Sequence, residues 1–157
     1  MTAATDIAEI LTVGLGGETF ALPATIVREI LDLGPVTPVP TAPAFVGRLI
    51  NVRGRVVPLA DLRLRFGMPA AEATIDTRVV VLEIEVEGEP TVVAILADKV
   101  YEVAHLDAVV TDEVPRVGMR WRPEFVRAIG RRNGEFVMVL DIGKVFASAE
   151  QAYVAEA

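Results

Sequence analysis

The sequence predicts an all-β fold with short helices, arranged as two small five-stranded barrels in one compact unit. Many short apolar segments alternate with turn residues roughly every 8 to 12 residues, which is typical of barrels and sandwiches. The chain also contains an internal repeat, which favours two small barrels over one sandwich. Of the 157 residues, 52% are hydrophobic, so the chain has enough apolar surface for a core and is not intrinsically disordered.

The internal repeat pairs residues 45–66 with residues 125–146, which align without a gap. A weaker similarity, which we call the weaker echo, precedes each copy, where residues 21–30 resemble residues 94–103. Because the copies share their apolar pattern, we expect their first phenylalanines to be buried in equivalent sites about an approximate two-fold axis. The identical positions are Phe45 and Phe125, Val46 and Val126, Gly54 and Gly134, Val57 and Val137, Asp61 and Asp141, and Phe66 and Phe146.

Each copy of the repeat predicts a β-hairpin. Arg53-Gly54 and Asn133-Gly134 stand between two apolar segments. Asn-Gly is the strongest short hairpin signal, because both central residues of a type I′ turn need positive φ. An aspartate follows the second strand of each hairpin, and its carboxylate is suited to capping the turn or helix that begins next.

Two further hairpins are predicted from the remaining apolar segments. One covers residues 10–22 around the turn Gly16-Gly17, and the other covers residues 77–97 around a turn at residues 87–89. Four prolines between residues 35 and 43 exclude regular structure there, except for a short edge strand.

Two short helices complete the predicted elements. Pro23 suits a first helical position, and the apolar residues Ile26, Val27, Ile30 and Leu31 then form one stripe at helical spacing. Apolar residues after the second repeat's aspartate have the same spacing, so a helix or tail is predicted over residues 142–157.

We expect these elements to form a single domain over residues 1–157. The first barrel is expected to cover about residues 15–70 and the second about residues 75–146, and terminal segments can cross from one barrel to the other. A loop over residues 67–76 joins the two halves.

Composition and residue types exclude several functions. The net charge is −7, with 22 acidic and 15 basic residues, which disfavours nucleic acid as a partner. There is no cysteine, and the only serine, Ser148, and the only histidine, His105, lack the surrounding motifs of a hydrolase. Gly14 to Gly17 precede a predicted strand instead of a helix, so they do not form a dinucleotide-binding loop. We therefore expect no enzyme activity, no cofactor and no metal.

The ends of the chain and its apolar segments bear on its location. The first residues carry acids and no basic segment, so they do not resemble a signal peptide. No apolar segment approaches the roughly 18 residues that a membrane-spanning helix needs. We expect a cytoplasmic protein without direct membrane insertion.

The segment from Phe45 to Gly67 resembles the signature of CheW-like domains. Matching segments before and after it extend the resemblance to about residues 8 to 147, including Phe20 to Pro23 and Leu140 to Phe146. The central motif consists of Phe45-Val46, Asn51-Val52-Arg53-Gly54, Val56-Val57-Pro58, Asp61-Leu62-Arg63 and Phe66-Gly67.

The resemblance implies a non-catalytic adaptor built from two intertwined SH3-like barrels. Members of this family join a chemotaxis histidine kinase, through its own similar regulatory domain, to the cytoplasmic tip of methyl-accepting chemoreceptors in signalling arrays. Carried over by motif position, the receptor contact is expected near Val27, Ile30, Arg48 and Arg53, the kinase contact near Val36 and Val39, and an ion pair between Glu29 and Arg53.

Arg48 departs from the family pattern, which usually has glycine at this position. A long charged side chain beside a receptor-binding surface is expected to select among receptors, because specificity often depends on repulsive as well as attractive elements. Two alternatives to the chemotaxis adaptor remain. One is a related CheW-like adaptor of another chemosensory pathway, serving pilus motility or gene regulation, and the other is a β-barrel enzyme that uses carboxylates.

Overall fold

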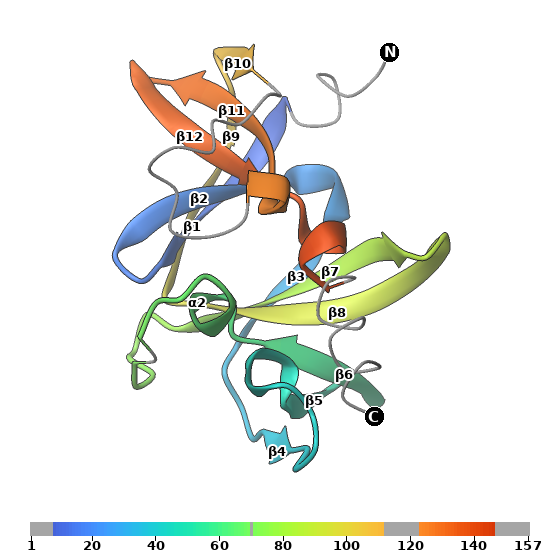
Figure 1. The fold of residues 1–157 in the computed structure, drawn as a ribbon. Helices are drawn as coiled ribbons and strands as arrows, with labels where there is room; N and C mark the ends of the chain where they lie inside the picture. The colour runs from blue at the N-terminus through green and yellow to red at the C-terminus, as the bar shows by residue number, and fades with distance from the viewer. Residues whose placement is uncertain (1–7, 70, 112–122, 147–157) are drawn as a thin grey trace.

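The computed structural model describes residues 8–69, 71–111 and 123–146, which form two six-stranded sheets (Figure 1). The first sheet consists of β3 (Val27–Asp32), β4 (Thr37–Pro38), β5 (Arg48–Val52), β6 (Arg55–Ala60), β7 (Arg78–Val86) and β8 (Glu89–Ala97). The second sheet consists of β1 (Glu9–Leu15), β2 (Glu18–Pro23), β9 (Lys99–His105), β10 (Ala108–Thr111), β11 (Val126–Arg132) and β12 (Glu135–Leu140).

The short helices stand at the junctions between strands. Three are single 3-10 turns, and one is a four-residue α-helix that follows β6. These are η1 (Ala24–Ile26), η2 (Ala44–Val46), α2 (Leu62–Arg65) and η3 (Pro123–Phe125). Residues 142–146 are also helical, as predicted, and the remainder of the expected C-terminal helix lies outside the described residues.

The two sheets have the same strand order, but each takes one hairpin from the other half of the chain. The first sheet runs β4-β5-β6-β8-β7-β3, and the second runs β10-β11-β12-β2-β1-β9. The hairpin β1–β2 therefore belongs to the sheet built by the second copy of the repeat. The hairpin β7–β8 belongs to the sheet built by the first copy. The halves of the chain are intertwined by a reciprocal exchange of hairpins.

Strand registers support this equivalence at the level of single residues. The exchanged strands pair in parallel with the last strand of each repeat, and the pairs are Leu59 with Ala94 and Val139 with Ala21. Leu59 and Val139 are equivalent in the repeat, and Ala94 and Ala21 are equivalent in its weaker echo. The two parallel junctions thus have the same register.

A shared apolar core lies between the sheets. Phe45 and Phe125 are both buried, with 7% and 1% of their surface exposed, as the repeat predicts. Phe45 packs against Phe146, and Phe125 packs against Phe66, at centroid distances of 6.3 and 5.9 Å. Since Phe66 and Phe146 are themselves equivalent, each repeat supplies the aromatic partner of the other. Two smaller clusters fill the inside of the individual sheets.

The predicted hairpin turns and caps are confirmed. Both central residues have positive φ in Arg53-Gly54, at 52° and 83°, and in Asn133-Gly134, at 52° and 79°. The Asp61 carboxylate accepts the backbone N–H of Arg63 at 3.1 Å. The Asp141 carboxylate likewise accepts the backbone N–H of Lys144 at 3.1 Å.

The helix predicted after Pro23 is wrong. Only the turn η1 is helical there, and Val27, Ile30 and Leu31 lie in the strand β3. Over so short a segment, helical spacing and strand alternation fit the same apolar residues. Pairing along β7 decides between them, because it satisfies the backbone groups of β3 that face β7 and leaves alternate residues of β3 partly buried.

The predicted all-β fold class is confirmed, with six strands in each sheet where five were expected. The additional strands are short or lie at edges. The two-residue strand β4 comes from the proline-rich segment, where a short edge strand had been allowed, and β3 replaces the expected helix. Prolines restrict such strands to sheet edges, where one side of the backbone needs no partner.

We predict that the two sheets unfold together, because their core residues are shared. Phe125→Ala should lower the free energy of unfolding by about 3–5 kcal/mol, since it removes a buried ring. Phe136→Ala is the matched control: its ring is 70% exposed, so the change should stay within about 0.5 kcal/mol. Denaturant titrations monitored by circular dichroism and by amide exchange would measure both. Separate transitions for the two sheets would contradict the shared core.

Candidate functional site

Two edge strands carry exposed apolar side chains at equivalent places. Ile30 on β3 lies opposite Val80, and Val103 on β9 lies opposite Leu11. Val80 and Leu11 both belong to the shared core, and directly paired residues of antiparallel strands point to the same face of a sheet. Ile30 and Val103 therefore extend that core to the surface, where they are 42% and 58% exposed.

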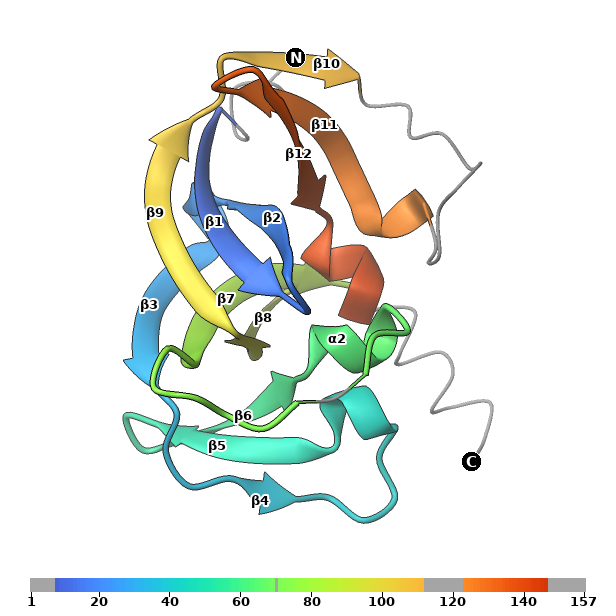
Figure 2. The same ribbon diagram turned by 90° about the vertical axis from the view of Figure 1, so that its left-hand side faces the viewer.

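These residues lie where the shared core between the two sheets reaches the surface. Val27 and Val100, which are equivalent in the weaker echo of the repeat, are partly buried against the shared core. Figure 2 shows β3 and β9 on the same side of the molecule, one in each sheet. We call the surface formed by Val27, Ile30, Val100 and Val103 the seam. The receptor contact expected from the sequence includes Val27 and Ile30, on β3. The residues on β9 were not predicted, although the weaker echo makes Val100 and Val103 the equivalents of Val27 and Ile30.

Arg53 reaches back to the strand that carries the first half of the seam. Its guanidinium donates two hydrogen bonds to the Glu29 carboxylate, at 3.1 and 3.0 Å. The hydrogen bond lowers the pKa of Glu29 from its ordinary value and raises the pKa of Arg53. A lowered carboxyl pKa means that the pair's contribution to stability is present at neutral pH and is lost as the pH falls through that pKa.

The second half of the molecule contains a similar ion pair. Arg132 donates to Glu102 at 2.9 and 3.0 Å, and Glu102 is the counterpart of Glu29 in the weaker echo. Arg132 immediately precedes Asn133, the counterpart of Arg53. An ion pair from the turn end of a hairpin to an edge strand is thus present in both sheets.

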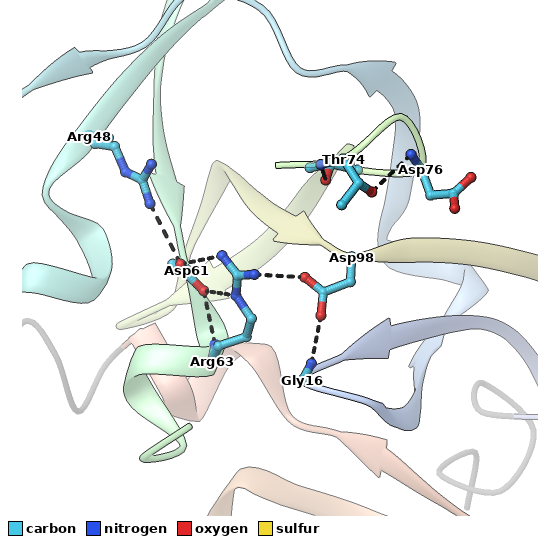
Figure 3. A network of polar contacts seen from close by, with 8 residues as sticks. Gly16, Arg48, Asp61, Arg63, Thr74, Asp76 and Asp98 are labelled. Atoms are coloured by element: carbon cyan, nitrogen blue, oxygen red, sulfur yellow. Dashed lines mark hydrogen bonds and ion pairs between the residues drawn. The ribbon is translucent and has the colours of Figure 1, made fainter. Parts of the chain in front are cut away.

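Arg48 lies at the opposite end of β5 from Arg53, close to α2. Its guanidinium is 3.6 Å from an Oδ of Asp61, and its side chain is 35% exposed (Figure 3). The structure therefore brings Arg48 to a buried carboxylate and does not bring it together with Val27 and Ile30, which lie on β3.

The Asp61 carboxylate belongs to a polar network that sequence reasoning missed. Arg63 donates from Nε and Nη2 to the two oxygens of Asp61, at 2.9 and 2.8 Å, and from Nη1 to Asp98 at 2.8 Å. The second oxygen of Asp98 accepts the backbone N–H of Gly16 at 2.7 Å (Figure 3). The side chains of Arg63 and Asp61 are only 5% and 2% exposed. The hydrogen bond with Asp61 raises the pKa of Arg63 against the opposing effect of burial.

An open groove of about 710 Å³ is lined mostly by residues of the first sheet and of the segment between β4 and β5. Its lining is mainly apolar and includes Val39, together with Glu87 and Glu89 of the hairpin β7–β8. Val36, the other residue expected at a kinase contact, instead packs against the core inside the first sheet. The remaining lining residues are Ala42, Pro43, Val46, Leu49, Pro58, Val86, Thr91, Val93 and Phe146.

No group of three or more metal-ligating side chains gathers within residues 8–69, 71–111 and 123–146. His105 is exposed on β9, where its Nε2 is 3.9 Å from Glu9, and Ser148 lies outside the described residues. Among the helices in the described part of the chain, none is long and apolar enough to cross a membrane.

Comparison with known proteins gives a consistent family assignment. The model of the CheW-like domain matches residues 9–150. A chemotaxis protein CheW of Rhizobium meliloti is 30% identical over 143 residues, covering 91% of this chain and 90% of the relative. A chemotaxis protein CheW of Klebsiella aerogenes is 30% identical over 146 residues, covering 93% and 86%. The crystal structure of the scaffolding protein TtCheW from Thermoanaerobacter tengcongensis superposes with a TM-score of 0.76 at 25% identity, covering 88% of this chain and 92% of that one.

We predict that two arginines of the signature differ sharply in their effect on stability. Arg63→Met should cost about 3–5 kcal/mol, because it leaves the buried carboxylate of Asp61 without its main partner. Arg53→Ala should leave the free energy of unfolding nearly unchanged, because its side chain is 79% exposed and water replaces its partner. Urea titrations at neutral pH measure both. Equal losses for the two variants would show that Arg53 is structural.

Proposed function

The chain belongs to the CheW-like domain family of non-catalytic chemotaxis scaffolding proteins, and from this premise we propose that it couples a chemotaxis histidine kinase to methyl-accepting chemoreceptors. In this role the chain works in the cytoplasm, where it binds the kinase's regulatory domain and the receptor's cytoplasmic tip. One observation carries the proposal. The chain presents two apolar surfaces, the seam and the groove, which share no residue.

The positions of the seam and the groove would allow the protein to bind two partners at once. In Figure 2, β3 and β9 lie on the left, whereas α2 and the helical residues 142–146 lie on the right. Phe146, at the end of that helical segment, lines the groove. A partner on the seam therefore leaves the groove open to a second partner, which is what an adaptor needs.

The seam suits a receptor helix. An amphipathic helix binds by placing apolar side chains at helical spacing into an apolar groove. Val27 and Ile30 supply one wall of such a contact, and Val100 and Val103 supply the other. The paired Arg53 and Glu29 stand beside the first wall, where they can exchange partners with charged residues of the incoming helix.

The groove suits the kinase's regulatory domain. Val39 lies on its apolar lining, where an apolar side chain of the kinase would lose water. The hairpin β7–β8 has nine residues in each strand, against seven and six in the equivalent β1–β2, and its end forms one wall. Glu87 and Glu89 at this end favour a partner with basic residues beside its apolar anchor.

We predict that Val103→Glu weakens binding to a receptor cytoplasmic-tip fragment by about tenfold or more, since it places a charge where an apolar contact is expected. Phe136→Glu is the control, because it adds the same charge at an exposed apolar residue outside the seam. Isothermal titration calorimetry with the receptor fragment measures the affinities. Equal weakening by both variants would locate the receptor contact elsewhere.

We predict that Val39→Glu weakens binding to the kinase's regulatory domain by about tenfold and leaves receptor binding unchanged. The added carboxylate would stand in the groove near Glu87 and Glu89, so it adds repulsion to the loss of an apolar contact. Val56→Glu, at a 70% exposed position on β6 outside the groove lining, is the control. Loss of receptor binding with intact kinase binding would reverse the assignment of the two surfaces.

A further inference from the structure

Asp98 stands where the chain passes from one sheet to the other. β8 of the first sheet ends at Ala97, and β9 of the second sheet begins at Lys99. A single residue therefore makes the crossing. The other crossing, from β2 to β3, passes through the three-residue turn η1. Any change in the angle between the sheets must alter the backbone at these two places.

Asp98 is held by contacts from both sheets. Its backbone N–H donates to the carbonyl oxygen of Gly14 on β1 at 2.9 Å. One carboxylate oxygen accepts the N–H of Gly16, at the tip of the hairpin β1–β2, and the other accepts Nη1 of Arg63. Arg63 lies on α2, directly after β6 of the first sheet. The carboxylate of Asp98 thus joins a hairpin of the second sheet to a helix of the first.

Packing at the same place supports the connection. Arg63 is itself fixed by its two bonds to the buried Asp61, and its carbonyl oxygen accepts the N–H of Met68 at 2.7 Å. The sulfur of Met68 lies so close to Gly16 that a Cβ there would stand 2.5 Å from it. The tip of β1–β2 is therefore seated on the segment that follows α2.

At the equivalent place in the second half, the described residues differ from this arrangement. The repeat places Asp141 opposite Asp61 but puts Gly143 where Arg63 stands, so that half has no guanidinium at this position. Thr25, the counterpart of Asp98 in the weaker echo, lies in η1 and is exposed. The residues equivalent to Arg63 and Asp98 therefore cannot form the same charged bridge between the sheets.

We propose that Arg63 and Asp98 are positioning residues that fix the crossing between β8 and β9 and thereby set the spacing of β3 and β9 across the seam. Arg63 is tied to β3 through the hydrogen-bonded strands β6, β8 and β7, and Asp98 immediately precedes β9. The inference rests on the proposed function only in naming a receptor as the ligand of the seam.

The hydrogen bonds of Arg63 and Asp98 are strong enough to fix the crossing, and those of Asp98 are exposed enough for water to replace them. Hydrogen bonds between charged groups are about twice as strong as neutral ones. Asp98, however, is 35% exposed, so water can take the place of Arg63 or Gly16, whereas the bond between Arg63 and Asp61 is shielded. Release at Asp98 frees the crossing and leaves the first sheet intact.

The test is a distance measurement across the seam by electron spin resonance. The chain has no cysteine, so Asp32→Cys and His105→Cys, at the exposed ends of β3 and β9, can be labelled without competition. Asp98→Asn removes one acceptor oxygen and sets an amide N–H₂ against Gly16 or Arg63, so at least one bond is lost. Asp76→Asn, at an exposed loop residue, is the control.

In the Asp98→Asn variant, we expect the label–label distance distribution to widen about twofold or more, with receptor-fragment affinity falling about threefold. An unchanged distribution would overturn the proposal, whatever happens to stability. A wider distribution with unchanged receptor affinity would support the positioning role and count against the seam as the receptor site. The experiment therefore tests the positioning role and the proposed receptor site independently.

A pair of glycine variants tests the seat of the hairpin independently. Gly16→Ala and Gly17→Ala both place a side chain at positive φ, but only the first brings a Cβ against Met68, since nothing lies within 4 Å at Gly17. We expect a wider distribution for Gly16→Ala alone, and its return to normal when Met68→Ala is added. Equal effects of the two glycine variants would overturn the proposed seat.

Discussion

The structure depends on the reciprocal exchange of hairpins between its two halves. Each sheet is completed by strands from the other half of the chain, through parallel pairs such as Leu59 with Ala94 and Val139 with Ala21. The aromatic core repeats the exchange, because Phe45 packs on Phe146 and Phe125 packs on Phe66. Neither sheet can bury its apolar face without the other, so the molecule has one main core, shared by both sheets, and its surfaces are fixed relative to each other.

This constraint explains where binding surfaces arise. A shared core between two sheets must end at the sheet edges, and at β3 and β9 it ends in side chains that remain partly exposed, Ile30 and Val103. The seam is therefore a direct consequence of the exchange and needs no additional element. It also makes the seam sensitive to the angle between the sheets, which gives the crossing at Asp98 its importance.

The sequence predicts the repeat, its hairpins and its caps because these depend on local signals, such as Asn133-Gly134 and Asp61. It fails at β3, where six residues are too few to separate helical from strand spacing and pairing with β7 decides. The network of Asp61, Arg63 and Asp98 could not be predicted from the sequence for another reason. Asp98 is 35 residues from Arg63, and only the crossing of the exchanged hairpin brings them together. Val103 was within reach, since its equivalence to Ile30 follows from the repeat.

An adaptor that joins two different partners needs two different surfaces, and an exact repeat would present the same surface twice. The two halves of the chain differ at positions that shape the groove and the crossing between the sheets. The hairpin β7–β8 is longer than β1–β2 and builds a wall of the groove, and Arg63 stands where the second half has Gly143. The common frame keeps the hairpins, the aromatic pairs and the ion pairs at the edges. Divergence at a few positions adds the groove and the charged network at the crossing to the first sheet. Unlike partners can therefore bind a molecule with two-fold architecture.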